Sequence, residues 1–122
     1  MLWAFKGDRP LYLQIIDQIK LRIISGVYPA GTRLPSVREL ASEASVNPNT
    51  MQKALSELER EHLVFSQRTT GRFITEDEHM IEQVKKSLAE EQILLFFDKM
   101  EALGYDREQT LSLVAGSAKE DM

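Results

Sequence analysis

The pattern of apolar positions predicts a helix in the first quarter of the chain. One side of this helix carries Tyr12, Ile15, Ile16, Ile19 and Ile23, which recur at helical spacing after Pro10. Gly26 ends the pattern, because glycine readily adopts the left-handed conformation that follows the last turn of a helix. Pro29 and Gly31 then disfavour a second helix, so a loop is expected over residues 26–35.

Two shorter helices are expected next, with a tight turn between them. Ser36 stands three residues before Glu39, which is the capping-box pattern of a helix start. Asn47 is a favoured N-cap and Pro48 suits the first helical position. The second helix should therefore begin within about one residue of Pro48 and run to about Glu61. Two short helices joined by a tight turn form a helix-turn-helix.

The second of these helices has two unlike faces. Its apolar face carries Met51, Ala54, Leu55 and Leu58. Its polar face carries Asn49, Thr50, Gln52 and Lys53. Asn and Gln can pair with adenine, Thr can contact a base edge or a thymine methyl, and Lys can reach a phosphate or guanine. Taken alone, the helix is more typical of an ordinary amphipathic helix, so the DNA-reading interpretation depends on the neighbouring segments.

Arginines flank the start of the first short helix. Arg33 and Arg38 stand on either side of Ser36. The free amide hydrogens and the dipole of a helix N-terminus attract anions, so two arginines and a hydroxyl at this place predict a phosphate clamp. The alternative is that each arginine pairs with Glu39 or another acidic neighbour at the surface.

A β-hairpin is predicted after the helix-turn-helix. Two β-prone runs, residues 63–65 and 72–75, flank a polar turn. Arg68, Gly71 and Arg72 lie at its tip, where arginine can enter a narrow minor groove and glycine permits a close approach to the backbone. The alternative is that polar residues and glycine simply form the turn. The position beside a helix-turn-helix favours the DNA-contacting interpretation.

The last third of the chain predicts a long helix and a short one after a hinge at residues 76–80. Gly104 ends the long helix, and Asp106 with Gln109 offers a cap for the short one. The long helix is apolar over more than one stripe in its second half, which one small domain cannot cover, so a homodimer is expected. The expected dimer contacts are Leu88, Ile93, Leu94, Phe96, Phe97, Met100, Leu103, Leu111 and Val114. The alternative is that these helices fold back on their own winged domain.

Composition agrees with this division of the chain into residues 1–75 and 76–122. The 122 residues suffice for one small core with an appendage, and the net charge is −4. Residues 1–75 hold ten Lys and Arg against seven Asp and Glu, whereas residues 76–122 hold five against twelve. A mildly basic first part suits contact with phosphate, and an acidic second part would face away from it. Chance clustering of surface charge is the alternative.

Several functional classes are not expected from the composition. There is no cysteine, which excludes disulfides and thiolate zinc sites. His62 and His79 lie in no recognisable nucleophile, metal or phosphate-loop motif, so we expect no enzyme, no metal and no cofactor. Neither a secretory signal nor a stretch of about 20 apolar residues is present. The protein is therefore expected to lie in the cytoplasm and not to associate with a membrane.

Taken together, these segments resemble the GntR family of bacterial transcription regulators. The resemblance is carried by Pro10–Tyr12, Ile19–Gly26, Pro29–Ala41, Val46–Thr50 and Gly71, and it covers roughly residues 10–75. Its most specific part is a loop ending in Leu-Pro-Ser that is followed by an Arg-Glu-Leu-Ala helix. The resemblance implies a winged helix-turn-helix that binds DNA.

The resemblance also implies roles for single residues. Arg38, Asn49, Thr50 and Gly71 match positions that contact DNA in the family, and Ser36 and Arg33 match phosphate contacts. Many members have arginine where this chain has Gln52, so a contact with adenine is expected there instead of one with guanine. About 45 residues follow the wing, which resembles the short YtrA-like subfamily, whose two-helix tail serves mainly for dimerisation.

The expected protein is mainly α with a small β-hairpin: a winged helix-turn-helix at residues 1–75 and a helical dimerisation tail at residues 76–122. It is expected to be a homodimeric repressor that binds a palindromic operator in double-stranded DNA. The expected DNA contacts are Arg33, Ser36, Arg38, Asn47, Asn49, Thr50, Gln52, Lys53, Arg68, Gly71 and Arg72. An alternative function is a winged-helix adaptor that binds proteins and not DNA. Phe96, Phe97 and Tyr105 either belong to the dimer core or lie near a site for a small-molecule inducer between the C-terminal helices and the winged domains.

Overall fold

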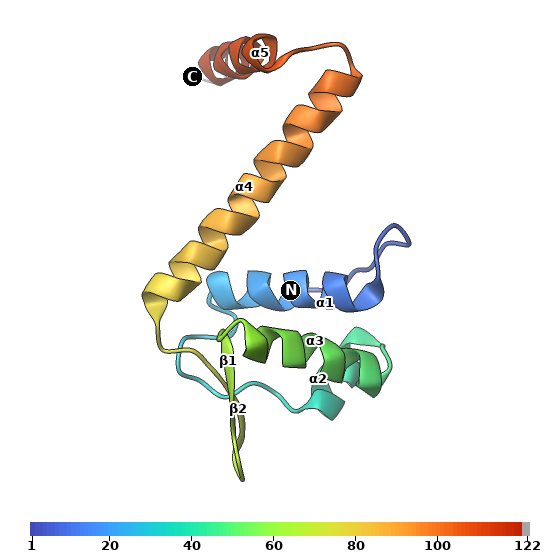
Figure 1. The fold of residues 1–122 in the computed structure, drawn as a ribbon, viewed down its shortest axis with the longest axis vertical. Helices are drawn as coiled ribbons and strands as arrows, with labels where there is room; N and C mark the ends of the chain where they lie inside the picture. The colour runs from blue at the N-terminus through green and yellow to red at the C-terminus, as the bar shows by residue number, and fades with distance from the viewer. Residues whose placement is uncertain (121–122) are drawn as a thin grey trace. The chain divides into compact units, whose positions relative to one another are not determined.

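The computed structural model describes residues 1–120, with side chains up to residue 117. In chain order, its elements are α1 (Leu11–Ile24), α2 (Val37–Ala44), α3 (Pro48–Arg60), β1 (Val64–Gln67), β2 (Gly71–Ile74), α4 (Glu78–Ala102) and α5 (Arg107–Glu120) (Figure 1). The predicted class, mainly α with a small β-hairpin, is confirmed. The chain divides into two compact units, Met1–Lys85 and a second that begins at Lys86.

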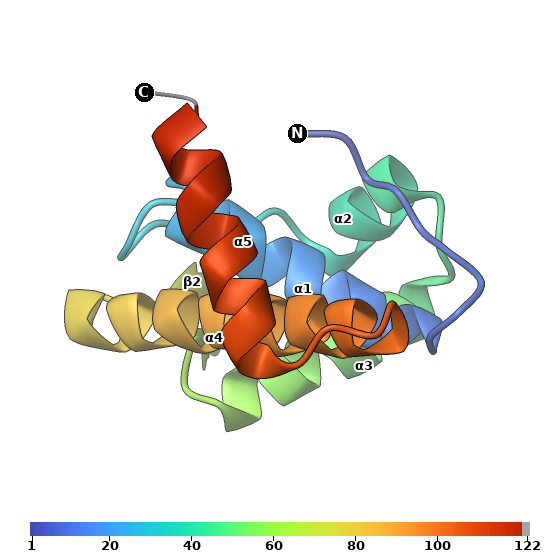
Figure 2. The same ribbon diagram turned by 90° about the horizontal axis from the view of Figure 1, so that it is seen from above.

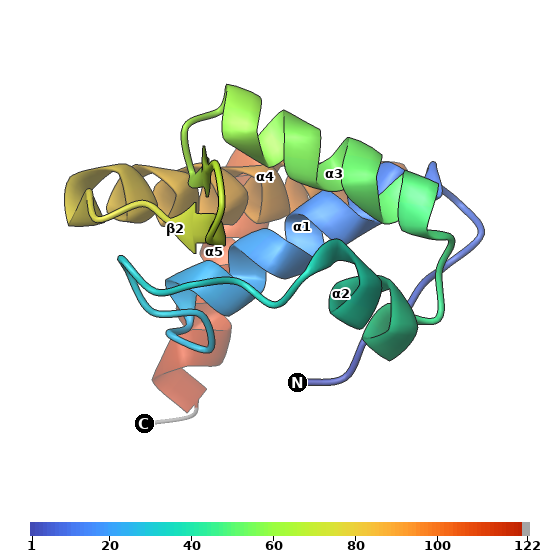
Figure 3. The same ribbon diagram turned by 90° about the horizontal axis from the view of Figure 1, so that it is seen from below.

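The core of the first unit is formed by helices α1, α2 and α3 together with the base of the hairpin. Figure 3 shows α3 lying along α1, with α2 beside the start of α3. The side chains that are almost entirely buried include Ile15, Ile19, Leu40, Met51, Leu55, Leu58 and Leu63. Burial of each such side chain contributes about 1.5–3 kcal/mol relative to an exposed position. These contacts fix how α3 is rotated about its own axis.

The turn between α2 and α3 has a defined geometry. Ser45 ends α2 in the left-handed conformation, with φ 56°. The amide of Ser45 donates to the carbonyl of Ser42, and the amide of Val46 donates to that of Ala41. This is the hydrogen-bond pattern of a Schellman motif. The chain therefore turns tightly between the two helices, and Asn47 is placed to cap α3.

The end of the loop before α2 pairs with the edge of β2. The amide of Leu34 donates to the carbonyl of Arg72 at 2.8 Å, and the amide of Ile74 donates to that of Thr32 at 2.8 Å. Arg33 and Phe73 form an antiparallel bridge between these bonds. The loop predicted over residues 26–35 is confirmed, and its end is held in place because residues 32–34 satisfy hydrogen-bonding groups at the edge of β2.

An extended segment before α1 is held by a polar stripe on that helix. Gln14 accepts a hydrogen bond from the amide of Lys6 at 2.8 Å and donates to its carbonyl at 2.7 Å. Gln18 binds the amide and carbonyl of Ala4 in the same manner. The guanidinium of Arg22 lies 3.7 Å from the ring centroid of Trp3. The N-terminal segment is thus part of the first unit, and its residues Trp3 and Phe5 pack against the core.

Helix α4 begins at the core of the first unit. Asp77 caps it by accepting a hydrogen bond from the amide of Met80 at 3.1 Å. Met80, Ile81 and Val84 pack against the core. The hinge expected at residues 76–80 is therefore shorter than predicted, because the helix starts at Glu78.

The second unit is formed by the later part of α4 and by α5, which a short turn connects (Figure 2). Gly104 ends α4 with φ 98°, and Asp106 and Gln109 each accept a hydrogen bond from the other's backbone amide. Both predicted signals are confirmed. Large apolar side chains remain exposed in this unit, namely Ile93, Leu94, Leu95, Phe96, Leu103, Tyr105, Leu111, Leu113 and Val114. No helix in the described part of the chain is long and apolar enough to span a membrane.

Candidate nucleic-acid interface

Helix α3 presents a polar surface opposite its buried face. The side-chain oxygen of Asn47 accepts a hydrogen bond from the amide of Asn49 at 2.7 Å, and Pro48 follows as the first helical residue. Since Met51, Ala54, Leu55 and Leu58 are buried, the exposed side chains of α3 are forced to the other side. Asn49, Gln52 and Lys53 are exposed, and Thr50 is half-buried. The oxygen of Asn47 is engaged in capping, so Asn47 serves first to place its neighbours.

Ser56 extends this polar surface by one turn. The side-chain amide of Gln52 donates to the hydroxyl of Ser56 at 3.4 Å, and both residues are exposed. The sequence interpretation did not include Ser56 among the candidate contacts. Its spacing of four residues from Gln52 was the available signal, because such residues are neighbours on a helix.

Arg38 lies in the first turn of α2, beside a complete capping box. The hydroxyl of Ser36 accepts from the amide of Glu39 at 3.1 Å, and a carboxylate oxygen of Glu39 accepts from the amide of Ser36 at 3.3 Å. These bonds leave the amides of Val37 and Arg38 as the donors of the first turn that lack a partner within the helix. Within the described part of the chain, neither Arg33 nor Arg38 forms an ion pair, which removes the expected alternative of pairing with Glu39.

Arg33 lies against the tip of the hairpin. A Cβ atom added to Gly71 would lie 3.1 Å from the Nε atom of Arg33, so the guanidinium occupies the space that a side chain would need. Gly71 also has φ +103°, a conformation that favours glycine. The side chain of Arg33 therefore lies at the wing, whereas Arg38 lies in the first turn of α2. Arg68 is exposed in the same turn.

Arg72 is engaged in an ion pair between the wing and α3. Its Nε atom donates to a carboxylate oxygen of Glu59 at 2.6 Å, and the hydroxyl of Ser66 donates to the same oxygen. The side chain of Arg72 is only 20% exposed. The sequence predicts Arg72 among the DNA contacts of the hairpin tip. In the structure its charge is largely compensated by Glu59, because the alternation of side chains along β2 places Arg72 on the face that meets α3.

The pKa of Glu59 reflects this ion pair. Partial burial acts to raise the pKa of the carboxyl group. The hydrogen bonds from Ser66 and Arg72, together with the charge of Arg72, act in the opposite direction and outweigh burial, so the pKa of Glu59 is lowered. The folded state therefore gains stability from the ionised carboxylate.

Lys53 also has a partner within the fold. Its ammonium nitrogen lies 3.7 Å from the centroid of the Tyr12 ring, and Tyr12 is a half-buried residue of α1. A cation over an aromatic face is attracted by the electron density of the ring. Lys53 is thus drawn toward α1, on the side of α3 that packs against that helix.

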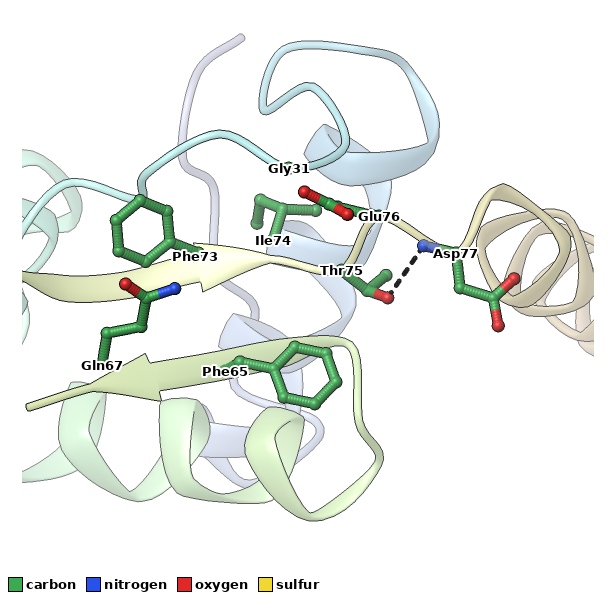
Figure 4. A pocket seen from close by; sticks show the side chains of 8 residues that line it. All are labelled: Gly31, Phe65, Gln67, Phe73, Ile74, Thr75, Glu76 and Asp77. Carbon is green, nitrogen blue, oxygen red and sulfur yellow. Dashed lines mark hydrogen bonds between the residues drawn. The ribbon is translucent and has the colours of Figure 1, made fainter.

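A cleft of about 450 Å³ lies on the other face of the hairpin (Figure 4). It is lined by Gly31, Phe65, Gln67, Phe73, Ile74, Thr75, Glu76 and Asp77. Phe65 and Phe73 are paired across the two strands and so share this face. The carboxylates of Glu76 and Asp77 make the cleft unsuitable for a phosphate, which places it outside the candidate interface.

A second cleft, of about 290 Å³, lies where α4 turns into α5. It is lined by Leu94, Phe97, Asp98, Glu101, Tyr105, Asp106 and Arg107. Phe97 and Tyr105 were among the three aromatic residues considered for an inducer site. The third, Phe96, is exposed and does not line the cleft.

Comparisons with known proteins agree with this geometry. The family described as "Bacterial regulatory proteins, gntR family" matches residues 11–74. The uncharacterized HTH-type transcriptional regulator YhcF of Bacillus subtilis (strain 168) is 40% identical over 107 residues, which are 88% of this chain and 88% of YhcF. The HTH-type transcriptional repressor YtrA of the same organism is 37% identical over 101 residues, which are 83% of this chain and 73% of YtrA.

Solved structures show the same fold. A GntR family transcriptional regulator from Listeria monocytogenes has a TM-score of 0.81 and 38% sequence identity, covering 92% of this chain and 98% of that protein. The N-terminal domain of AraR in complex with mutant ORR3 has a TM-score of 0.53 and 26% identity, covering 57% of this chain and all of that domain.

The ion pair of Glu59 predicts a pH-dependent contribution to stability. Replacing Glu59 with Gln should lower the free energy of unfolding at pH 7 by about 0.5–1 kcal/mol, because the pair is partly exposed. A lowered pKa gives stability that is present above the pKa of the unfolded chain and lost as the pH falls through the folded value. Urea unfolding from pH 7 to pH 3 should therefore show wild type and variant converging in acid.

Glu57→Gln is the matched control, since Glu57 lies on the same helix and, among the described residues, forms an ion pair only with the exposed Arg60. It should change stability less at pH 7. A Glu59→Gln variant as stable as wild type at pH 7 would contradict the role of the ion pair in fixing the wing.

Proposed function

The chain belongs to the gntR family of bacterial regulatory proteins, and on this premise we propose that it is a homodimeric repressor that binds a palindromic DNA operator in the cytoplasm. One observation carries the proposal. The exposed face of α3 is polar along its length, while Arg38 stands in the first turn of α2 and Arg33 lies at the wing tip beside Gly71. In this proposal, these cations flank the groups of α3 that would read bases.

In the proposed complex, α3 enters the major groove and its first two turns read bases. Asn49 and Gln52 have amide side chains that can donate and accept, which suits the N6 and N7 atoms of adenine. Thr50 is half-buried and adds a hydroxyl and a methyl group at the edge of this surface. Asn47 holds these residues in place through the cap described above.

Phosphate contacts are assigned to the residues around this helix. Arg38, the hydroxyl of Ser36 and the free amides of the first turn of α2 would hold one phosphate. Arg33, Arg68 and Gly71 would meet the minor groove or its backbone from the wing. Arg72 contributes indirectly, because its pairing with Glu59 fixes the hairpin to α3.

The homodimer is supported by the exposed apolar side chains of α4 and α5. Ile93 is 52% exposed, Leu94 57% and Leu111 54%, which is unusual for so many large apolar residues in one small unit. A two-fold axis would give two reading helices spaced by about 34 Å or a multiple, which matches an inverted repeat. The name of YtrA, a transcriptional repressor, supports repression as the outcome of binding.

The cleft at the junction of α4 and α5 offers a place for an inducer. It combines the aromatic rings of Phe97 and Tyr105 with charged groups of both signs. A ligand there would act on the same helices that are proposed to form the dimer, and so on the spacing of the reading helices.

Replacing Arg38 with Ala tests the proposed interface. Operator DNA selected from the source genome should bind the variant at least about 1 kcal/mol more weakly, because a charge-assisted phosphate contact is lost. The slope of log affinity against log salt should fall by about one unit. Thermal stability should stay nearly unchanged, since Arg38 is exposed and forms no ion pair in the described structure.

Lys86→Ala, which removes an exposed cation of α4, is the control and should bind as wild type does. If Arg38→Ala binds with unchanged affinity and salt slope, the phosphate assignment is wrong. If the wild-type protein selects no sequence at moderate salt, a protein-binding adaptor becomes the better proposal.

The dimer is tested by charge substitution in the apolar surface. Wild type should sediment as a dimer, and Ile93→Asp combined with Leu111→Asp should give a folded monomer, because a buried unpaired carboxylate strongly opposes association. Gln92→Asp adds the same group at an exposed polar position of α4 and should leave the dimer intact. A wild-type protein that stays monomeric at high concentration contradicts the proposal.

A further inference from the structure

We propose that Tyr12 of α1 is a positioning residue for operator binding, which holds the ammonium of Lys53 ready for a DNA phosphate. The inference rests on the proposed function, and it deepens that function by assigning a role to a residue outside the helix-turn-helix. It also selects between the two targets open to Lys53, a phosphate and a guanine.

The contact joins a half-buried ring to the cation of an exposed side chain. Tyr12 is the second residue of α1. It is half-buried and packs against the core, so its ring has little conformational freedom. Lys53 is exposed, and its nitrogen lies 3.7 Å from the ring centroid. In the described residues no carboxylate lies within ion-pair distance of Lys53, so its charge is not cancelled. The ring orients the cation and leaves it available.

The direction of the contact distinguishes Lys53 from Asn49 and Gln52, the residues that are proposed to read bases. Successive residues of a helix project about 100° apart, so Gln52 and Lys53 point to different sides. Gln52 turns to Ser56 along the helix, at 3.4 Å. Lys53 instead turns to α1. The opposite edge of α3 is tied to the wing through Glu59 and Arg72.

A cation at the edge of a groove-bound helix is placed to meet a phosphate. The major groove is about 12 Å wide, so a helix lying in it has the two phosphate backbones along its flanks and the base edges in front of it. Lys53 is held toward one flank by Tyr12. The geometry therefore points to a phosphate contact, and to Gln52 as the neighbouring residue that reads a base.

Tyr12 would act by restricting Lys53 before DNA arrives. A free lysine side chain samples many rotamers, and this freedom is lost when it binds a phosphate. A cation–π contact that already limits these rotamers lowers that loss. The contact requires the aromatic ring and not the hydroxyl group, so phenylalanine should replace tyrosine without loss.

A double-mutant cycle on the full chain tests this coupling, with a selected operator as the probe. Lys53→Gln should weaken binding and lower the salt slope by about one unit, as expected for one phosphate contact. Tyr12→Leu should weaken binding about two- to fivefold, the range of an exposed cation–π contact. Tyr12→Phe should bind as wild type does. The double variant, Tyr12→Leu with Lys53→Gln, should bind no more weakly than Lys53→Gln alone.

Three results would overturn the proposal. Additive losses in the double variant would mean that Tyr12 acts independently of Lys53. A Tyr12→Phe variant as weak as Tyr12→Leu would assign the effect to the hydroxyl, and an unchanged salt slope for Lys53→Gln would exclude a phosphate contact. In these cases wild type still binds its operator, so the proposed function stands. A wild-type protein that selects no DNA would refute both. Thermal melts of every variant establish that the fold is retained.

Discussion

The burial of one face of α3 is the constraint on which the rest of the first unit depends. Met51, Ala54, Leu55 and Leu58 are completely buried against α1, α2 and the base of the hairpin. Removing any of the larger ones would leave a cavity and cost about 2–5 kcal/mol. Because the helix cannot rotate without exposing these side chains, the outward directions of Asn49, Gln52 and Lys53 are fixed by apolar packing. Any recognition of bases by this helix is thus prepared by residues that never touch DNA.

Two polar contacts refine that orientation on opposite edges of α3. Glu59 of α3 binds Ser66 and Arg72 of the wing. Lys53 of α3 contacts the ring of Tyr12 in α1. Each is weak compared with the apolar packing, since both are partly exposed. Their importance lies in position, because they fix the wing and a cation relative to the surface that would meet DNA. Gly71 adds a steric condition, as it leaves room for the guanidinium of Arg33.

Features that depend on neighbouring residues in the sequence could be predicted. The start of α3 at Pro48, the capping box of Ser36 and Glu39, and the end of α4 at Gly104 follow from local hydrogen bonding and backbone freedom. Features that join distant segments could not. Residues 32–34 form a β-bridge with the edge of β2, and Arg72 pairs with Glu59, which lies thirteen residues away in the sequence. Tyr12 and Lys53 are even farther apart in the sequence, so their contact depends on the packing of α1 against α3.

The central claim is that α3, held in this rotation, reads bases through Asn49 and Gln52. Selection of bound sequences from random DNA tests it most directly, performed in parallel with wild type and with a Gln52→Arg variant. Wild type should select an inverted repeat, and the variant should select the same repeat with adenine replaced by guanine at one position of each half-site, because arginine pairs with the O6 and N7 atoms of guanine. Identical selected sequences for the two proteins, or no enriched sequence for wild type, would contradict the claim.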